Sequence, residues 1–514
     1  MKNKVVASLI GLLVFPSLCL AGPGKETIRL SLQECIQRVL EDNLGIRAGR
    51  IDPRIADTEV TTARSEFDPN LSFDLFANKN KELSATQLSG AGALEEETRG
   101  FNTGLEQKLI TGGTYNVDWT NQRYRTNSQW FTINPSYSSG VDLGLKQPLL
   151  RNFGIFVNKS QIMIAMNNME MSEYDFKQSV IDTVAEAENI YWDLTYAIEN
   201  VEVSIQSYNL SEDLVKINQA KVAVGTLPPV EVLKAQSTSA SRKETIIISE
   251  NTLREVRDRV FQIANMPQLR EDVDYEIVPV DKPEVVPVAV DQLQSMKVAL
   301  ERRPDYLSKK VEIENRGIEL RVAKNQLLPV LDLEASLGSN GLGGNYANDL
   351  DTLGSADYYN WGGGLALSIP LGNRLARSTY KRRKLEVERA LIELKDLEQD
   401  IIVQIRGAVR DINSDLERVR AARVARKLAS EQLSQEQKRL DVGRATTHDV
   451  LEYQDDFARS QKNEMNAMVD YLQSLVALER AKGTLLEKRN VVLEGLYPME
   501  AKGKENKKGK GKIK

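Results

Sequence analysis

The chain has 514 residues, enough for two or three ordinary domains or for one large elongated unit. Its formal net charge is −5, so the basic excess typical of nucleic-acid binding is missing and no nucleic-acid partner is expected. His448 is the single histidine, which argues against a His/Cys metal site or a Ser-His-Asp triad, and no Walker-type phosphate loop occurs.

An enzyme that works with carboxylates alone stays compatible with this composition. However, acids scattered through a heptad pattern usually form a solvated helix face. We therefore expect no enzymatic activity, no catalytic, cofactor-binding or metal-binding residues, and no cofactor.

The N-terminus has the features of a secretory signal peptide, expected over residues 1–21. Lys2 and Lys4 precede an apolar run, Val5–Phe15, that is too short to span a bilayer, and Cys19-Leu20-Ala21 offers a small-residue cleavage site. The alternative is a buried N-terminal helix. Cleavage would leave Cys35 alone, so no intrachain disulfide is expected, which fits the bacterial periplasm or outer membrane.

No later segment approaches 18 consecutive apolar residues, so a mature chain that crosses a membrane would have to do so as a β-barrel. At the other end, Ala501–Lys514 is rich in Gly and Lys and cannot bury apolar area, so a disordered tail is expected over residues 491–514. A nucleic-acid-binding or lipid-binding arm is the alternative for this tail.

The chain repeats itself once. Ala63-Arg64 aligns with Ala323-Lys324 at an offset of 260 residues, and the following Phe67-Asp68-Pro69 aligns with Leu327-Leu328-Pro329. Later blocks match at offsets of 222 (Leu145–Leu149 with Leu367–Leu371) and 218 (Val224–Leu233 with Val442–Leu451). The fall from 260 to 222 means that the first repeat carries 38 extra residues in its middle. Two copies are too few for a solenoid.

Each repeat contains the same series of segments. The expected boundaries are an N-terminal helix (22–66), strands (67–150), a long α-hairpin (151–265), a linker (266–289), the second N-terminal helix (290–327), its strands (328–372) and the second α-hairpin (373–490).

The strand-like stretches are rich in Gly, Thr, Ser and aromatic residues: Asn102–Ile110, Thr114–Tyr124, Gly140–Gln147, Leu331–Leu337 and Gly362–Ile369. In Val141–Lys146 apolar and polar residues alternate, as a strand between lipid and water requires. The clustering of Trp and Tyr here fits aromatic belts at membrane interfaces. The alternation is equally compatible with a half-buried sheet of a soluble protein.

Heptad spacing predicts two very long helices. Val184, Ala187, Tyr191, Leu194, Ile198, Val201, Ile205 and Tyr208 follow each other by steps of three and four, as do Ile402, Ile405, Val409, Ile412, Leu416 and Val419. No proline interrupts Ile155–Leu227 or Leu371–Tyr497, so each helix could run about 65–70 residues, roughly 100 Å. Gly225–Pro229 and Gly443–Thr446 then end them, and return helices are expected over Pro229–Ala264 and Thr447–Glu487.

Both helix turns carry the same motif, and this combination resembles the TolC family of outer-membrane factors over roughly residues 27–490. Val224-Gly225-Thr226 is followed by Glu231-Val232-Leu233, and Val442-Gly443-Arg444 by Asp449-Val450-Leu451. The resemblance implies a mixed, mostly α fold with two internal structural repeats. Strands from each of three chains would form a transmembrane β-barrel that continues into a long periplasmic α-helical coiled-coil tunnel.

The resemblance also implies a function, a location and partners. The chain would be a subunit of a homotrimeric export duct for efflux or type I secretion, in contact with outer-membrane lipid and extending into the periplasm of a Gram-negative cell. A periplasmic adaptor protein would couple it to an inner-membrane transporter.

Asp449 and Glu452 lie three residues apart after the second turn and share one helix face. In the resembling family, acids at these matching positions line the periplasmic entrance, where six carboxylates from three chains would favour cations. The alternative is a solvated helix start whose acids complement the macrodipole. Glu231, at the matching place of the first turn, is expected to assist the closed gate. The family's gate arginine would fall at Ala445, whereas this chain has Arg444.

The two turns are the expected adaptor contacts. Gly225 and Gly443 would permit the tight bends, and the residues presented to the adaptor would be Val224, Thr226, Leu227, Val442 and Arg444. Simple helix termination by the glycines is compatible with this role.

Two other classes of protein compete with the export duct. A periplasmic coiled-coil or surface fibre without a pore would explain the heptads but not the duplicated strand blocks. A general diffusion porin would explain the strands but not the long helices. The family usually has four strands per chain, and the extra residues here leave room for two more strands or for a long extracellular loop such as Leu83–Thr98.

Overall fold

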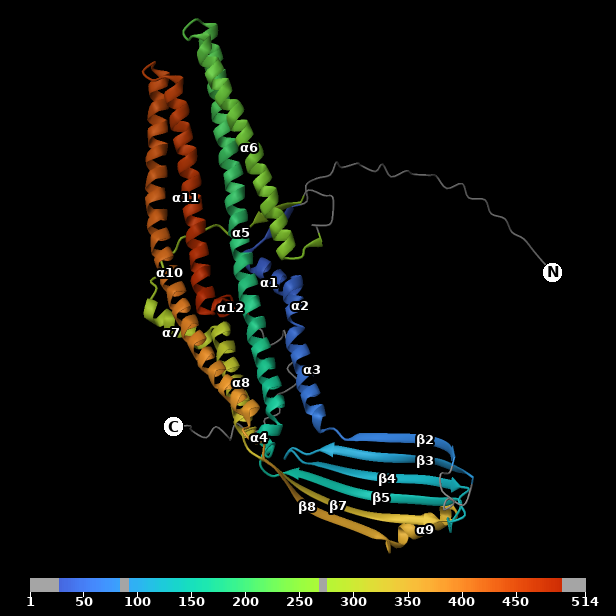
Figure 1. Cartoon of the computed structure of the whole chain (residues 1–514). Helices are drawn as coiled ribbons and strands as arrows, with labels where there is room; N and C mark the ends of the chain where they lie inside the picture. Colours follow the sequence, from blue (N-terminus) through green and yellow to red (C-terminus); the bar gives the residue numbers. More distant parts are fainter. Residues whose placement is uncertain (1–26, 84–91, 268–274, 492–514) are drawn as a thin grey trace, which may run out of the picture. The chain divides into compact units, whose positions relative to one another are not determined.

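A computed structural model describes residues 27–83, 92–267 and 275–491 (Figure 1). The expected signal peptide and nearly all of the Lys-rich tail lie outside these residues. The described chain is a mostly α, mixed fold that divides into two compact units. Of the described residues, the first unit comprises 27–43, 187–267, 275–285 and 419–469, and the second comprises 44–83, 92–186, 286–418 and 470–491.

The second unit contains one antiparallel sheet in the order β2-β3-β4-β5-β7-β8 (Figure 1). Its strands are β2 (Asn70–Leu83), β3 (Ala93–Lys108), β4 (Thr114–Thr126), β5 (Ser136–Pro148), β7 (Val330–Gly343) and β8 (Tyr359–Ser368). The first repeat therefore supplies four strands and the second supplies two. Of the two alternatives for the extra residues, the structure has two additional strands, and Ala93–Thr98, suggested above as loop, belongs to β3.

The register of the sheet separates apolar and polar side chains. Cross-strand partners point to the same face, so Leu71, Leu105, Val117, Leu143, Leu337 and Trp361 belong to one face. The neighbouring row, Ser72, Gly104, Asp118, Asp142, Gly338 and Asn360, belongs to the other. Many large apolar side chains of the first face are exposed in the single chain, among them Leu75 (75%) and Trp361 (75%).

Short helices precede the strands in each repeat. The predicted N-terminal helix of the first repeat is divided into α1 (Leu32–Asp42), α2 (Leu44–Gly49) and α3 (Asp52–Arg64), followed by a short 3-10 helix (Ser65–Phe67). That of the second is divided into α7 (Gln292–Arg302) and α8 (Pro304–Asn325). Pro53 and Pro304 occupy the first turns of α3 and α8, where their missing N–H groups leave no hydrogen bond unmade.

Four longer helices form two α-hairpins: α5 (Ser160–Ala223) with α6 (Pro229–Ile263), and α10 (Arg374–Asp441) with α11 (Thr447–Lys482). The first members have 64 and 68 residues, close to the predicted length. The short helices α4 (Ile155–Asn158) and α12 (Leu485–Lys488) flank them, and α9 (Tyr346–Ser355) joins β7 to β8. No helix within the described ranges combines the length and hydropathy of a bilayer-spanning segment.

The predicted seam of α5 is one residue out of register beyond Leu194. Val184, Ala187, Tyr191 and Leu194 are buried, but Ile205 is 41% exposed, whereas Ser204, Ser207 and Ser211 are buried. The hydroxyl groups of Ser204 and Ser211 donate to carbonyls of the preceding turn, so these small side chains can be buried in a close helix contact. A pattern based on apolar residues alone misses such positions.

Part of the stretch predicted as a linker, residues 266–289, pairs with a distant segment of the chain. This stretch contains β6 (Glu276–Pro279), which pairs in parallel with β1 (Thr27–Leu30), so Leu30 is a strand residue and the first helix starts at Leu32. Tyr191 of α5 lies beside this pair, and its hydroxyl oxygen is within hydrogen-bond distance of the Leu30 carbonyl (3.1 Å) and of the Asp281 carboxylate (2.9 Å). A four-residue strand that needs a partner about 250 residues away gives no local signal.

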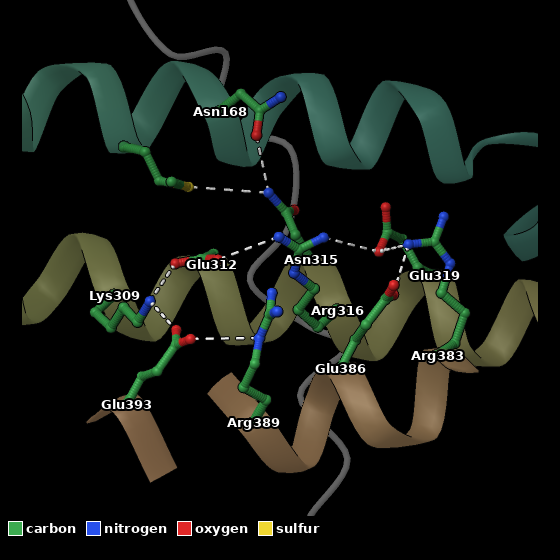
Figure 2. Close-up of polar contacts among 11 residues, drawn as sticks. Asn168, Lys309, Glu312, Asn315, Arg316, Glu319, Arg383, Glu386, Arg389 and Glu393 are labelled. Carbon is green, nitrogen blue, oxygen red and sulfur yellow. Dashed lines mark hydrogen bonds and ion pairs between the residues drawn. The ribbon is translucent and has the colours of Figure 1, made fainter. Parts of the chain in front are cut away.

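Ion pairs connect α8 with α10 in the second unit (Figure 2). Lys309 bonds both Glu312 of its own helix (2.8 Å) and Glu393 of α10 (2.7 Å). Arg383 of α10 bonds Glu319 of α8 (2.9 Å). The other members are Arg316, Glu386 and Arg389. The bases and the acids of α8, and the acids of α10, each recur at a spacing of seven residues, so this is a charged seam of the coiled-coil type.

Candidate functional site: the hairpin turns

Both hairpin turns have the same backbone structure. Gly225 and Gly443 have φ values of 78° and 72°, a left-handed conformation that favours glycine. The Gly225 N–H donates to the Val222 carbonyl and the next N–H to Lys221, both at 2.9 Å. Gly443 and Arg444 repeat these bonds to Leu440 and Arg439. Each turn is thus a Schellman motif, in which two carbonyls at the helix end are satisfied by the residues that follow.

The return helices begin differently. In the first hairpin, Pro228 precedes Pro229 at the start of α6, where the fixed φ of proline suits the first helical turn. In the second, Thr446 and Asp449 form a reciprocal cap: the Asp449 carboxylate accepts from the Thr446 N–H (2.8 Å) and hydroxyl (2.7 Å), and the Thr446 hydroxyl accepts from the Asp449 N–H.

The predicted gate acids therefore lie on two helix starts. The hydrogen bonds from Thr446 hold the pKa of Asp449 below its ordinary value, so this carboxylate stays ionised at neutral pH. Glu452 is exposed one turn further along α11. Glu231, in the first turn of α6, pairs with Lys234 (2.8 Å). Both sequence-based interpretations of Asp449, gate residue and helix cap, remain compatible with this geometry.

The residues predicted to meet an adaptor lie on the surface of the single chain. Val224 is 74% and Val442 is 69% exposed, and Thr226 and Arg444 are exposed as well, while Leu227 is half-buried. Arg444 takes part in its turn through its backbone, because its N–H donates to the Arg439 carbonyl (2.7 Å).

The matching acidic-Val-Leu motifs have unequal surroundings. Val450 and Leu451 of the second hairpin are buried with Leu214 of α5 and Leu433 of α10. In the first hairpin, by contrast, Leu233 is 66% exposed. The second motif is therefore part of the core, whereas the first presents an apolar side chain at the surface.

Two polar contacts that sequence reasoning missed tie the hairpins together within the first unit. Asn218 of α5 donates to the Glu231 carbonyl of α6 (3.2 Å), and its amide oxygen accepts from the Thr447 hydroxyl of α11 (3.3 Å). Both Asn218 and Thr447 are nearly fully buried, at 1% and 3% exposure. A buried amide with both of its groups bonded fixes the relative position of three helices.

Arg242 of α6 makes the second contact. Its guanidinium donates to Gln454 of α11 (2.7 Å) and to the carbonyls of Ser207 (3.0 Å) and Leu451 (3.2 Å), and it approaches Asp455 (3.3 Å). The side chain is only 7% exposed, and burial lowers the pKa of Arg242 below its ordinary value.

A sequence signal for Arg242 exists. The buried residues Ala235, Ser239, Arg242 and Ser249 follow the heptad steps of α6, so the arginine occupies a seam position between small residues. A search for apolar seams passes over it.

The described residues hold no group of three or more His, Cys, Asp or Glu side chains arranged to bind a metal ion. The geometry is instead that of a two-faced sheet and paired α-hairpins with matching end turns, as in a channel-forming outer-membrane factor.

The family profile for outer membrane efflux proteins matches residues 35–265 and 296–484. The chain belongs to this family, that of the TolC-like outer-membrane factors, as the sequence motifs predicted. It is 22% identical to the pyoverdine export outer membrane protein OpmQ of Pseudomonas aeruginosa over 462 residues, 88% of this chain and 85% of OpmQ. It is 28% identical to the outer membrane protein TolC of Vibrio cholerae over 171 residues, 33% of this chain and 38% of TolC.

Solved structures show the same fold. The outer membrane channel CmeC of Campylobacter jejuni superimposes with a TM-score of 0.65 at 16% identity, covering 88% of this chain and 86% of CmeC. The outer-membrane channel OprN gives a TM-score of 0.65 at 15% identity, with 88% and 90% coverage.

Proposed function

We propose that this chain is one of three identical subunits of an export duct that crosses the outer membrane and extends into the periplasm. An inner-membrane transporter drives export through a periplasmic adaptor that contacts the hairpin turns. The duct serves efflux or type I secretion. A signal peptide over residues 1–21 directs the chain across the inner membrane.

The observation that supports this proposal best is the two-faced sheet with open edges. The described strands β2 and β8, of 14 and 10 residues, each pair on one side only. Long unpaired edges are unfavourable in a finished protein and would be satisfied by neighbouring copies that close the sheet. One face is apolar and the other polar, as a wall between lipid and water requires.

Exposed apolar side chains on the long helices also support an assembly of several copies. Val403, Val424 and Leu428 of α10 are 63%, 59% and 53% exposed, and Ile247 of α6 is 61% exposed. Each helix of a closed helical tunnel has a neighbour on both sides, so the outermost helices of a single chain lack neighbours that adjoining copies would supply.

In the trimer, Asp449 and Glu452 would form a ring of six carboxylates at the periplasmic entrance, with Glu231 close to it. The depressed pKa of Asp449 keeps this residue charged, and a ring of carboxylates attracts cations. The ring would restrict passage until the adaptor, bound at Val224 and Val442, opens the turns.

Electron microscopy of the chain purified from outer membranes in detergent tests the proposal. We expect a three-fold particle with a hollow stalk. A solid rod or a monomer would contradict it and would favour the fibre without a pore.

The ring is tested by conductance in planar bilayers. Asp449→Asn with Glu452→Gln should raise the current and reduce cation selectivity, and Glu431→Gln, an exposed acid of α10, is the control. If the double variant and the Glu431→Gln control have the same cation selectivity, Asp449 and Glu452 do not line the gate.

A further inference from the structure

The two additional strands lie in the middle of the sheet. β3 and β4 lie between β2 and β5. The second repeat has only two strands, β7 and β8, which pair directly with each other; in the first repeat the corresponding strands, β2 and β5, are separated by the inserted hairpin. A tight turn joins β3 to β4: the Leu109 N–H donates to the Gly113 carbonyl (2.7 Å), and Gly112 has a φ of 96°. Because a hairpin adds one strand in each direction, β2 and β5 keep their antiparallel order.

The inserted hairpin shares the two-faced pattern of its neighbours. On the apolar face, the Phe101 ring lies 6.1 Å from Phe73 of β2 and 5.5 Å from Trp119 of β4. On the polar face, Asp118 of β4 is the direct partner of Asp142 of β5. A hairpin surrounded by water would expose this continuous apolar row to solvent, which is unfavourable. We therefore expect β3 and β4 to lie in the same environment as the rest of the sheet.

Helix α9 packs against the apolar face of the sheet. Asp349 of α9 accepts a hydrogen bond from the Ser139 N–H (3.0 Å), and a Cβ atom on Gly341 would come within 2.4 Å of the Asp349 carbonyl. Gly341 lies four residues from Leu337 on the same strand and thus on the apolar face. The helix therefore covers the end of the apolar face around Gly341, beyond the exposed Leu337.

We propose that three copies close a barrel of 18 strands, and that its exit is wider than the 12-stranded barrel formed by three chains with four strands each. This inference rests on the proposed trimer. With strands about 4.8 Å apart and tilted by about 40°, the backbone diameter is about 36 Å for 18 strands and about 24 Å for 12. The exit is about 1.5-fold wider and its cross-section about 2.3-fold larger, so it admits bulkier cargo.

The test is electron microscopy of the full chain and of a variant that lacks residues 93–126, with Gly92 joined to Asn127. This deletion removes β3 and β4 and preserves the direction of every other strand. We expect three-fold particles in both cases, with 18 strands for the full chain, 12 for the variant, and a diameter ratio of about 1.5.

A three-fold particle of the full chain with 12 strands would overturn the wide barrel and leave the trimeric duct intact. A two-fold particle, which also reaches 12 strands, or a monomer would overturn the duct itself.

Single cysteines provide a test that needs no deletion. Cys35 is buried and its pKa is raised to about 12, so it gives little background. In membranes, a water-soluble maleimide should label Asn102→Cys on the polar face of β3 and spare Thr103→Cys on the apolar face. Asp142→Cys and Leu143→Cys on β5 are the matched pair.

Equal labelling of both β3 positions, with normal discrimination on β5, would place the inserted hairpin outside the wall and refute the inference. Loss of discrimination on both strands would instead refute a sheet that separates lipid from water.

Discussion

Replacing Arg242 with methionine should loosen the contact between the two α-hairpins. Methionine preserves much of the apolar stem but removes all four donor contacts, to Gln454, Asp455 and the carbonyls of Ser207 and Leu451. Asp455 is 60% exposed and regains water, so its share of the loss is small. The other three acceptors lose a charged donor in a buried position.

Each hydrogen bond to a charged group contributes about 1.5–3 kcal/mol, but such losses are not additive, so we expect about 3–5 kcal/mol in all for the three buried acceptors. Since about 1.4 kcal/mol corresponds to a factor of ten, local opening between α6 and α11 should become about 10²- to 10⁴-fold more frequent. Arg242→Lys keeps the charge without the planar fork, so it should have an intermediate effect.

Hydrogen–deuterium exchange measures this opening directly. Amides of α5, α6 and α11 near Ser207, Arg242 and Gln454 should exchange faster in Arg242→Met, while β4 and β5 stay unchanged. Arg254→Met, at an exposed position of the same helix, is the control and should change the free energy of opening by less than about 0.5 kcal/mol. If the two variants exchange alike, the Arg242 contacts do not hold the hairpins together.

Three further predictions concern turns and charges. Gly443→Ala should lower the free energy of unfolding in urea by about 1–2 kcal/mol, because Gly443 has a φ of 72°. Gly407→Ala, within α10 and with no atom near the added Cβ, should be neutral or stabilising. Equal effects of the two substitutions would refute a turn that requires glycine. Because the pKa of Asp449 is lowered, the hydrogen bonds of its carboxylate to Thr446 stabilise the start of α11 at neutral pH, and this stabilisation is lost as the pH falls through that pKa. Acidification should therefore make this helix start susceptible to cleavage by pepsin. Asp449→Asn should be cleaved there already at the highest pH tested. Lys309 lowers the pKa of Glu393, so this pair also stabilises the chain at neutral pH and fails on acidification; Lys309→Met should lower the Tm at neutral pH more than at acid pH, and an equal drop at both would refute the pairing.

Local patterns in the sequence were sufficient for the long helices, their turns and the family. Gly225 and Gly443 end the helices because a left-handed residue closes a Schellman turn, and this requires only neighbours within five residues. The heptad steps around Tyr191 and Ile405 likewise report which side of a helix is buried. Such features need no information about distant parts of the chain.

Contacts between distant segments were decided by the tertiary structure. The parallel pairing of β1 with β6, the seam shift to Ser204 and the buried role of Arg242 depend on partners far away in the sequence. The composition of the 38 extra residues is compatible with either a loop or strands. They form strands because β3 pairs with β2 and β4 pairs with β5, which the sequence alone does not show. The physical reason is that polar seam residues and short strands gain their stability from specific partners, whereas helix periodicity and glycine turns gain theirs from adjacent residues.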